Sequence, residues 1–147
     1  MTTFAWTAGL LAVAGLLPAL LVLRRRLAVV VVSGLSMEPT FHAGDRLLVR
    51  RARLTGISAG DVVVFETPDW LETGEPLPPE RRWMVKRAVA LPGDPVPDSV
   101  RPVVPDHRVA PDRLVVLGDN PSASFDSRQC GLIDGGTLLG VVLRRLS

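Results

Sequence analysis

The chain contains one lysine, Lys86, beside sixteen arginines. A guanidinium keeps its proton in proteins, whereas a lysine ammonium loses its proton when burial removes its water, and the neutral amine is a base. β-Branched and aromatic residues predict a strand over Trp83–Ala90. Met84, Lys86, Ala88 and Ala90 then share one face, and we expect its apolar or small neighbours to lower the lysine pKa. A genome rich in arginine codons also explains a single lysine, and the count alone leaves both explanations open.

A serine that can act as a nucleophile, Ser36, lies just after the apolar run Leu27–Val32. Pro39 keeps the residue before it out of helical geometry, and Gly34 lets another backbone segment approach closely. A rigid turn of this kind can aim a hydroxyl and a backbone N–H at one substrate carbonyl. By itself the segment also fits an ordinary junction between strand and turn. It lacks the second glycine of a hydrolase elbow, and no well-placed histidine is present, so Lys86 is the remaining candidate base.

A third polar segment runs from Gly118 to Arg128. Its Gly-Asp-Asn-Pro sequence indicates a turn, and beyond it Ser124, Asp126 and Arg128 recur at every second residue. In an extended strand these three side chains share one face, which would align a hydroxyl with an ion pair. A solvated hairpin edge with a surface salt bridge worth about 0 to 1 kcal/mol fits the same pattern.

In their order along the chain, the segments around Ser36, around Lys86 and from Gly118 to Arg128 resemble the motifs of type I signal peptidases. These serine-lysine membrane peptidases include the bacterial leader peptidase and the mitochondrial inner membrane protease. The resemblance spans residues 33–145 and implies that Ser36 is the nucleophile and Lys86 the general base. It further implies that Ser124 orients the lysine amine. Asp126 and Arg128 would pair and hold the site rigid.

The resemblance also implies an oxyanion hole and a substrate. Some members of the family place a second serine two residues before the nucleophile, where this chain has Gly34. We therefore expect the oxyanion hole to consist of backbone N–H groups, chiefly that of Ser36, unless Ser33 reaches it. Ser33, Gly34 and Met37 are the candidate oxyanion and substrate-binding residues. The implied substrates are precursors whose signal peptides carry small residues before the cleaved bond. Residues 95–117 are too few for the extra β domain of larger members, which makes this a short form.

Short β-rich runs alternate with turn residues and predict a mainly β, antiparallel catalytic domain over residues 27–147. The predicted strands are Leu27–Val32, Arg46–Arg50, Asp61–Phe65, Trp83–Ala90, Arg113–Leu117 and Leu138–Leu143. Two proline-rich stretches, 67–80 and 92–111, are predicted to be irregular loops.

Residues 4–23 carry no charge and consist mainly of Leu, Ala, Val and Gly. Twenty helical residues span about 30 Å, the thickness of a bilayer core. We therefore predict that residues 1–26 form a transmembrane anchor with a basic flank, which makes the protein a single-pass protein of the cell membrane. A cleaved signal peptide is the alternative. The length of the apolar run and the lack of a basic residue before it favour the anchor.

The charged and metal-binding side chains argue against other classes of function. All seventeen basic and fifteen acidic residues lie beyond residue 23, so the remainder is nearly charge-balanced. The arginine clusters have no interleaved aromatic platform, and we expect no nucleic-acid partner. Cys130 is the only cysteine, and His42 and His107 lack ligand spacing. We therefore expect no metal and no cofactor.

These observations predict a membrane-anchored serine endopeptidase that removes signal peptides through an acyl-enzyme. A dedicated maturation protease for one precursor remains an alternative. Self-cleaving repressors also use serine and lysine on a β fold, but they need a DNA-binding region and an Ala-Gly bond ahead of the serine. Here Ala43-Gly44 and Ala59-Gly60 both follow Ser36. A non-catalytic β domain on a membrane tether is the third alternative, and the intact Ser36 and Lys86 argue against it.

The orientation in the membrane is open to two arguments. Arg24–Arg26 follow the apolar segment and no basic residue precedes it, which by the positive-inside tendency favours a cytoplasmic domain. The family resemblance implies the opposite side, because signal peptides are cleaved after translocation. We expect an extracytoplasmic catalytic domain, since a signal peptidase facing the cytoplasm would not meet its substrate.

Overall fold

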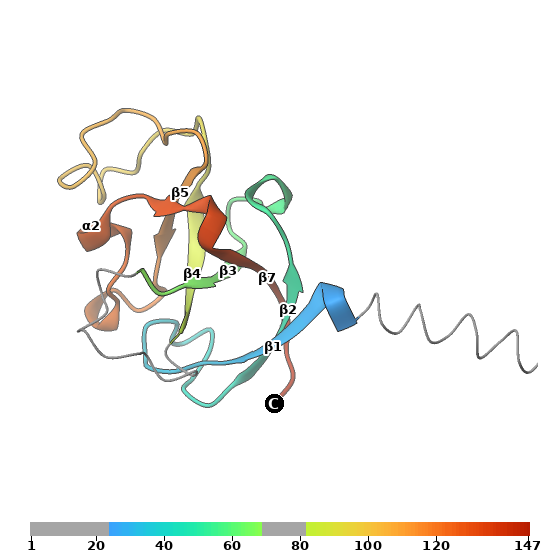
Figure 1. Cartoon of the computed structure of the whole chain (residues 1–147). Helices are drawn as coiled ribbons and strands as arrows, with labels where there is room; N and C mark the ends of the chain where they lie inside the picture. The colour runs from blue at the N-terminus through green and yellow to red at the C-terminus, as the bar shows by residue number, and fades with distance from the viewer. Residues whose placement is uncertain (1–23, 69–81) are drawn as a thin grey trace, which may run out of the picture.

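The computed structural model describes residues 24–68 and 82–147 (Figure 1). The strands are β1 (Leu27–Val31), β2 (Arg46–Arg51), β3 (Val62–Glu66), β4 (Trp83–Ala90), β5 (Arg113–Leu117), β6 (Ile133–Asp134) and β7 (Leu138–Arg145). The short helices are η1 (Leu54–Gly56), η4 (Pro121–Ala123), α2 (Ser127–Cys130) and η5 (Gly135–Thr137). Arg24–Arg26 are helical and lead directly into β1.

The seven strands form one curled sheet in the order β1-β2-β7-β3-β4-β5-β6 (Figure 1). Every pair of neighbouring strands is antiparallel. The predicted mainly β, antiparallel fold is therefore confirmed, and all six predicted strands form. Only β6 was not predicted, because a strand of two residues leaves no periodic signal.

The strand that carries Lys86, β4, lies inside the sheet between the central strand β3 and β5. The first four residues of β3, Val62 to Phe65, are all buried, as expected for a strand covered on both faces. β4 pairs with β3 along its whole length, which sets Lys86 opposite Val63. On its other side β4 pairs with β5 only from Arg87 onward. The edge of β4 before Arg87 is therefore not paired with β5.

Valine dominates three core clusters among the described residues. The first lies between β1, β2, β3 and β4, and it includes Met37 from the turn after β1. The second packs under β5 and β7 and includes Ala88 of β4. The third fills the loop between β4 and β5 with four valines: Val96, Val100, Val104 and Val109. The predicted irregular loop over 92–111 is confirmed, and this small core explains how it stays compact.

The membrane anchor predicted for residues 1–26 falls almost entirely outside the described residues. Within 24–68 and 82–147, no helix has the length and apolar character needed to cross a bilayer. Most of the predicted loop over 67–80 also lies outside the described residues.

Candidate active site

Lys86 is buried, with only 4% of its surface exposed. The alternation of β4 turns it to the same side as the half-buried Met84 and the buried Ala88, as expected. Burial is the main influence and lowers the pKa of the ammonium. The Asp126 carboxylate opposes this effect, and the Arg128 guanidinium reinforces it. No side chain among the described residues forms a hydrogen bond with the Lys86 amine. The predicted lowering of its pKa is confirmed in direction.

Ser36 lies in the tight turn that follows β1. Gly34 has a φ of +89°, and no other group comes within 4 Å of where a Cβ would stand. The expectation that Gly34 allows a close backbone approach is therefore wrong, since glycine is needed for the left-handed backbone. The buried Met37 packs into the first core cluster and anchors the turn. The peptide bond between Glu38 and Pro39 is cis.

The segment from Ser124 to Arg128 is not extended, contrary to the prediction of a shared strand face. Asp126 is the N-cap of α2 and accepts a hydrogen bond from the Arg128 N–H at 3.1 Å. The Gln129 side chain accepts one in return from the Asp126 N–H at 3.0 Å. The two bonds form a capping box, which starts a helix where the alternating pattern indicated a strand. The Asp-x-x-Gln spacing carried this signal.

The Asp126 carboxylate, 1% exposed, is the polar centre of this segment. Its Oδ2 accepts hydrogen bonds from the Gly118 N–H at 2.8 Å, the Ser124 hydroxyl at 2.6 Å and Arg128 at 2.5 Å. Its Oδ1 accepts the Arg128 Nε–H at 2.9 Å. Burial alone would raise the pKa of Asp126, but these bonds outweigh it and lower the pKa to about 2. The predicted pairing of Asp126 with Arg128 is therefore present and buried.

Residues 118–120 connect this centre to the turn of residues 34–40 that carries the predicted nucleophile Ser36, here called the nucleophile turn. Sequence reasoning missed this role. Asp119 accepts two hydrogen bonds from Arg87, at 2.6 and 2.9 Å, and one from the Thr40 hydroxyl at 2.5 Å. The Arg87 hydrogen bond is the main cause that lowers the pKa of Asp119. A Cβ on Gly118 would lie 2.1 Å from the Ser124 Oγ and 2.6 Å from the Ser36 carbonyl oxygen. Only glycine fits between these two groups.

Asn120 contacts the nucleophile turn directly. Its backbone N–H donates to the Ser36 carbonyl at 3.0 Å, and its side-chain amide donates to the Leu35 carbonyl at 3.1 Å. These partners lie 84 and 85 positions away along the chain. The turn predicted from Gly-Asp-Asn-Pro is present. Nothing local in the sequence indicated that Asn120 would donate hydrogen bonds to the Ser36 and Leu35 carbonyls.

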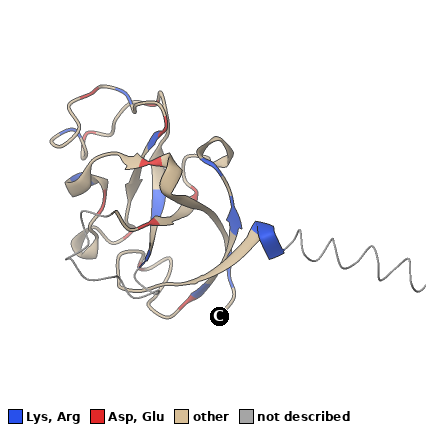
Figure 2. Ribbon diagram, in the orientation of Figure 1, with Lys and Arg blue, Asp and Glu red and all other residues tan. Residues whose placement is uncertain are grey.

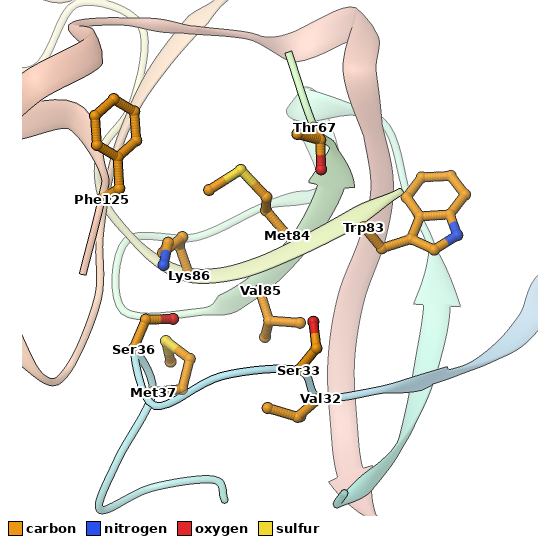
Figure 3. Close-up of a pocket in the computed structure, with 10 residues that line it drawn as sticks. All are labelled: Val32, Ser33, Ser36, Met37, Thr67, Trp83, Met84, Val85, Lys86 and Phe125. Atoms are coloured by element: carbon orange, nitrogen blue, oxygen red, sulfur yellow. The ribbon is translucent and has the colours of Figure 1, made fainter. Parts of the chain in front are cut away.

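A cleft of about 290 Å³ brings the candidate residues together (Figure 3). Figure 3 shows the Lys86 nitrogen directed toward the Ser36 hydroxyl at one end of the cleft. The other walls of the cleft are mainly apolar, and Ser33 and Thr67 add two more hydroxyl groups. The apolar lining residues are Val32, Met37, Trp83, Met84, Val85 and Phe125. Of the predicted oxyanion and substrate-binding residues, Ser33 and Met37 line the cleft, whereas Gly34 does not. No three His, Cys, Asp or Glu side chains gather for a metal ion within the part of the chain that the structure describes.

Together the fold and the cleft define an antiparallel β protein in which a serine hydroxyl faces a buried lysine amine. Comparison with known proteins agrees with this class. A family model described as "Signal peptidase, peptidase S26" matches residues 4–100 and 96–146. The chain belongs to this signal peptidase family, which confirms the resemblance seen in its motifs.

Several curated relatives carry related names. A "Probable signal peptidase I-2" of Synechocystis sp. is 32% identical, and the match covers 71% of this chain and 56% of the relative. A "Signal peptidase I V" of Bacillus subtilis is 27% identical over 76% of this chain and 80% of the relative. A "Signal peptidase I" of Leptolyngbya laminosa is 27% identical over 71% and 61%. The chain thus spans little more than half the length of the first of these relatives.

We expect Asp126→Ala to destabilise the fold, because it leaves Arg128 and the Gly118 N–H without their acceptor. The expected loss is roughly 2 kcal/mol or more, which lowers Tm by about 5 to 10 °C at neutral pH. Asp98→Ala is the matched control, since Asp98 forms an exposed ion pair with Arg101. Its Tm should stay near that of the wild type.

The pH dependence of this difference tests its electrostatic origin. The pKa of about 2 lies below the usual 3.8 of Asp, so the ionised carboxylate stabilises the fold fully above about pH 4. This contribution disappears as the pH falls toward 2. The gap in Tm between wild type and Asp126→Ala should therefore narrow over that range. An equal Tm for both proteins at neutral pH would contradict the assignment.

Proposed function

We propose that the protein is a membrane-anchored serine endopeptidase that removes signal peptides from exported precursors. One observation carries the proposal. In a member of the signal peptidase family, the Ser36 hydroxyl faces the amine of Lys86, whose pKa is lowered by burial. A nucleophile beside a base that loses its proton readily is what acyl transfer requires.

Ser36 and Lys86 carry the proposed reaction. Neutral Lys86 removes the proton from Ser36 as the oxygen attacks the scissile carbonyl, and the negative charge that develops is stabilised by the Ser36 backbone N–H. The ammonium of Lys86 then protonates the leaving amine. A water molecule attacks the acyl-enzyme with Lys86 again as the base, which releases the product and restores Ser36.

Asp126 and its partners support the base in this proposal. The Ser124 hydroxyl donates its one hydrogen bond to the Asp126 carboxylate. The Ser124 oxygen therefore remains available to accept a hydrogen bond from the lysine amine. Arg128 pairs with the Asp126 carboxylate and limits the pull of that negative charge on the Lys86 proton. Lysine can then be neutral without losing its fixed position.

The cleft supports the choice of precursors with small residues before the cleaved bond. The cleft has a volume of about 290 Å³ and is bounded by the reacting groups and by the apolar side chains of Met84, Trp83 and Phe125. In our proposal the precursor binds in extended form beside residues 27–33. Backbone hydrogen bonds would then hold the substrate, and shallow pockets would select its side chains.

Two features support attachment to a membrane. The strands β1, β2 and β7 contain no acidic residue, and arginines lie just before β1 and on β2 (Figure 2). Four large apolar side chains on or next to these strands are exposed: Val29, Val31, Leu143 and Leu146. Apolar side chains flanked by arginines suit a bilayer surface with anionic headgroups. In the sequence, the uncharged residues 4–23 are separated from β1 only by Arg24–Arg26.

We expect Lys86→Arg to abolish precursor cleavage as fully as Ser36→Ala, because it retains the charge and removes the titratable base. The measurement is cleavage of a peptide with alanine before the scissile bond and at the third position before it, by full-length protein in detergent. Arg113→Lys is the matched control, because it makes the reverse substitution at a partly exposed position of β5 outside the cleft and should leave the rate unchanged. Appreciable turnover by Lys86→Arg would rule out the serine-lysine mechanism.

We expect Ser124→Ala to lower kcat by about tenfold while the fold stays intact. The change removes one hydrogen bond, worth about 0.5 to 1.5 kcal/mol, and the group that orients the amine. Thermal unfolding and kcat are measured on the same preparation, with the exposed Ser58→Ala as control. A Tm loss as large as that of Asp126→Ala, with an unchanged rate per folded molecule, would show that Ser124 is only structural.

We expect the catalytic domain to face the outside of the cell membrane. The native thiol is a poor reporter, because burial raises the pKa of Cys130 to about 11. Asp98→Cys in a Cys130→Ala background places a thiol where the side chain is 92% exposed. A membrane-impermeant maleimide should label this variant in intact cells. Labelling only after the membrane is opened would place the domain in the cytoplasm.

A further inference from the structure

We propose that Asn120 is a positioning residue for the oxyanion hole, because it fixes the peptide group that carries the Ser36 N–H. The inference rests on the proposed peptidase function and extends it to a residue outside the cleft. Its basis is the pair of hydrogen bonds by which Asn120 holds the two carbonyl groups on either side of the Ser36 side chain.

The two bonds have different consequences for the turn. The backbone N–H of Asn120 donates to the Ser36 carbonyl at 3.0 Å, which holds the peptide group after the nucleophile. The side-chain amide donates to the Leu35 carbonyl at 3.1 Å, which holds the peptide group before it. Leu35 O also accepts the Glu38 N–H, at 3.2 Å. Two donors therefore hold the carbonyl oxygen of the peptide group before Ser36: the Glu38 N–H from the same turn and the Asn120 amide from a distant segment.

That peptide group contains the proposed oxyanion donor. The Leu35 carbonyl and the Ser36 N–H belong to one planar trans peptide, so they point in opposite directions. A group that holds the carbonyl oxygen therefore also fixes the direction of the N–H. Within residues 24–68 and 82–147 the Ser36 N–H donates no hydrogen bond, and this donor is available to a substrate.

Few other forces hold this peptide group. Gly34, which precedes it, has the most permissive backbone of any residue, and the Leu35 side chain is 51% exposed. The nearest apolar anchor is Met37, on the far side of the nucleophile. Since Leu35 is exposed and Met37 anchors the turn only beyond Ser36, the peptide group between Leu35 and Ser36 depends on hydrogen bonds, and the Asn120 amide donates one of them.

Asn120 is itself held firmly. The Ser122 hydroxyl donates to its Oδ1 at 2.8 Å, which turns the amide nitrogen toward Leu35. The preceding Asp119 is fixed by Arg87 and Thr40, so the backbone at Asn120 is tied both to β4 and to the end of the nucleophile turn. The Asn120 amide thus fixes the peptide group between Leu35 and Ser36 relative to β4, the strand that carries Lys86.

Substitutions at position 120 separate this role from general stability. Asn120→Ala removes the contact with Leu35 and retains the backbone bond to Ser36. Asn120→Asp keeps the shape but sets a carboxylate oxygen against the Leu35 carbonyl, so we expect it to be the slower variant. Asp61→Ala is the matched control, because it also removes one exposed side-chain contact with the backbone, to the Ser58 N–H at 2.9 Å.

We expect Asn120→Ala to lower kcat by about 10- to 100-fold, less than the 10²- to 10³-fold typical for complete loss of an oxyanion donor. KM should stay within about twofold, since the oxyanion forms only in the transition state. The pH at which kcat/KM reaches half its maximum should not move, because Lys86 is untouched. Asp61→Ala should match the wild type in kcat and KM.

The outcomes distinguish the two levels of the proposal. If the wild type fails to cleave the alanine-containing peptide, the proposed function fails. If the wild type cleaves it and Asn120→Ala keeps kcat within twofold, the positioning role is wrong and the peptidase function stands. A loss of rate explained by a lower Tm or by a higher KM would also overturn the positioning role.

Discussion

The buried carboxylate of Asp126 is the constraint on which the rest of the site depends. Burial of Lys86 lowers its pKa, but a carboxylate nearby draws a proton back to the amine. Arg128 resolves this conflict, because its guanidinium binds the same carboxylate through two N–H groups and itself disfavours the lysine cation. The buried charge is thus compensated, and the lysine can still be neutral.

Ser36 and Lys86 come from different parts of the fold. Lys86 lies on a strand paired with β3 and within the core, whereas Ser36 lies on an exposed turn beyond the edge strand β1. Residues 118–120 connect the two: Asp119 accepts hydrogen bonds from Arg87, and Asn120 donates to the backbone around Ser36. The geometry of the cleft therefore depends on a loop that contributes no reacting group.

Local patterns predicted the strands and the burial of Lys86, because β-branched runs and a period of two are properties of neighbouring residues. They failed where a different local rule prevailed, as in the capping box that turned Asp126 into a helix start. They also failed where the partner is distant. The contacts of Asn120 and Asp119 with the nucleophile turn cross 79 to 85 residues, and no local signal carries that information.

In the proposed mechanism, the hydroxyl of Ser124 lets a buried charge orient the base without protonating it. A hydroxyl can donate one hydrogen bond, and Ser124 donates it to the Asp126 carboxylate at 2.6 Å. Any hydrogen bond between Ser124 and the lysine must then have the amine as donor. A neutral amine that donates a hydrogen bond to Ser124 would keep its lone pair for the Ser36 hydroxyl, toward which Figure 3 shows the Lys86 nitrogen directed. In the proposed mechanism Asp126 thereby sets the direction of the base through a neutral group, while its charge stays paired with Arg128.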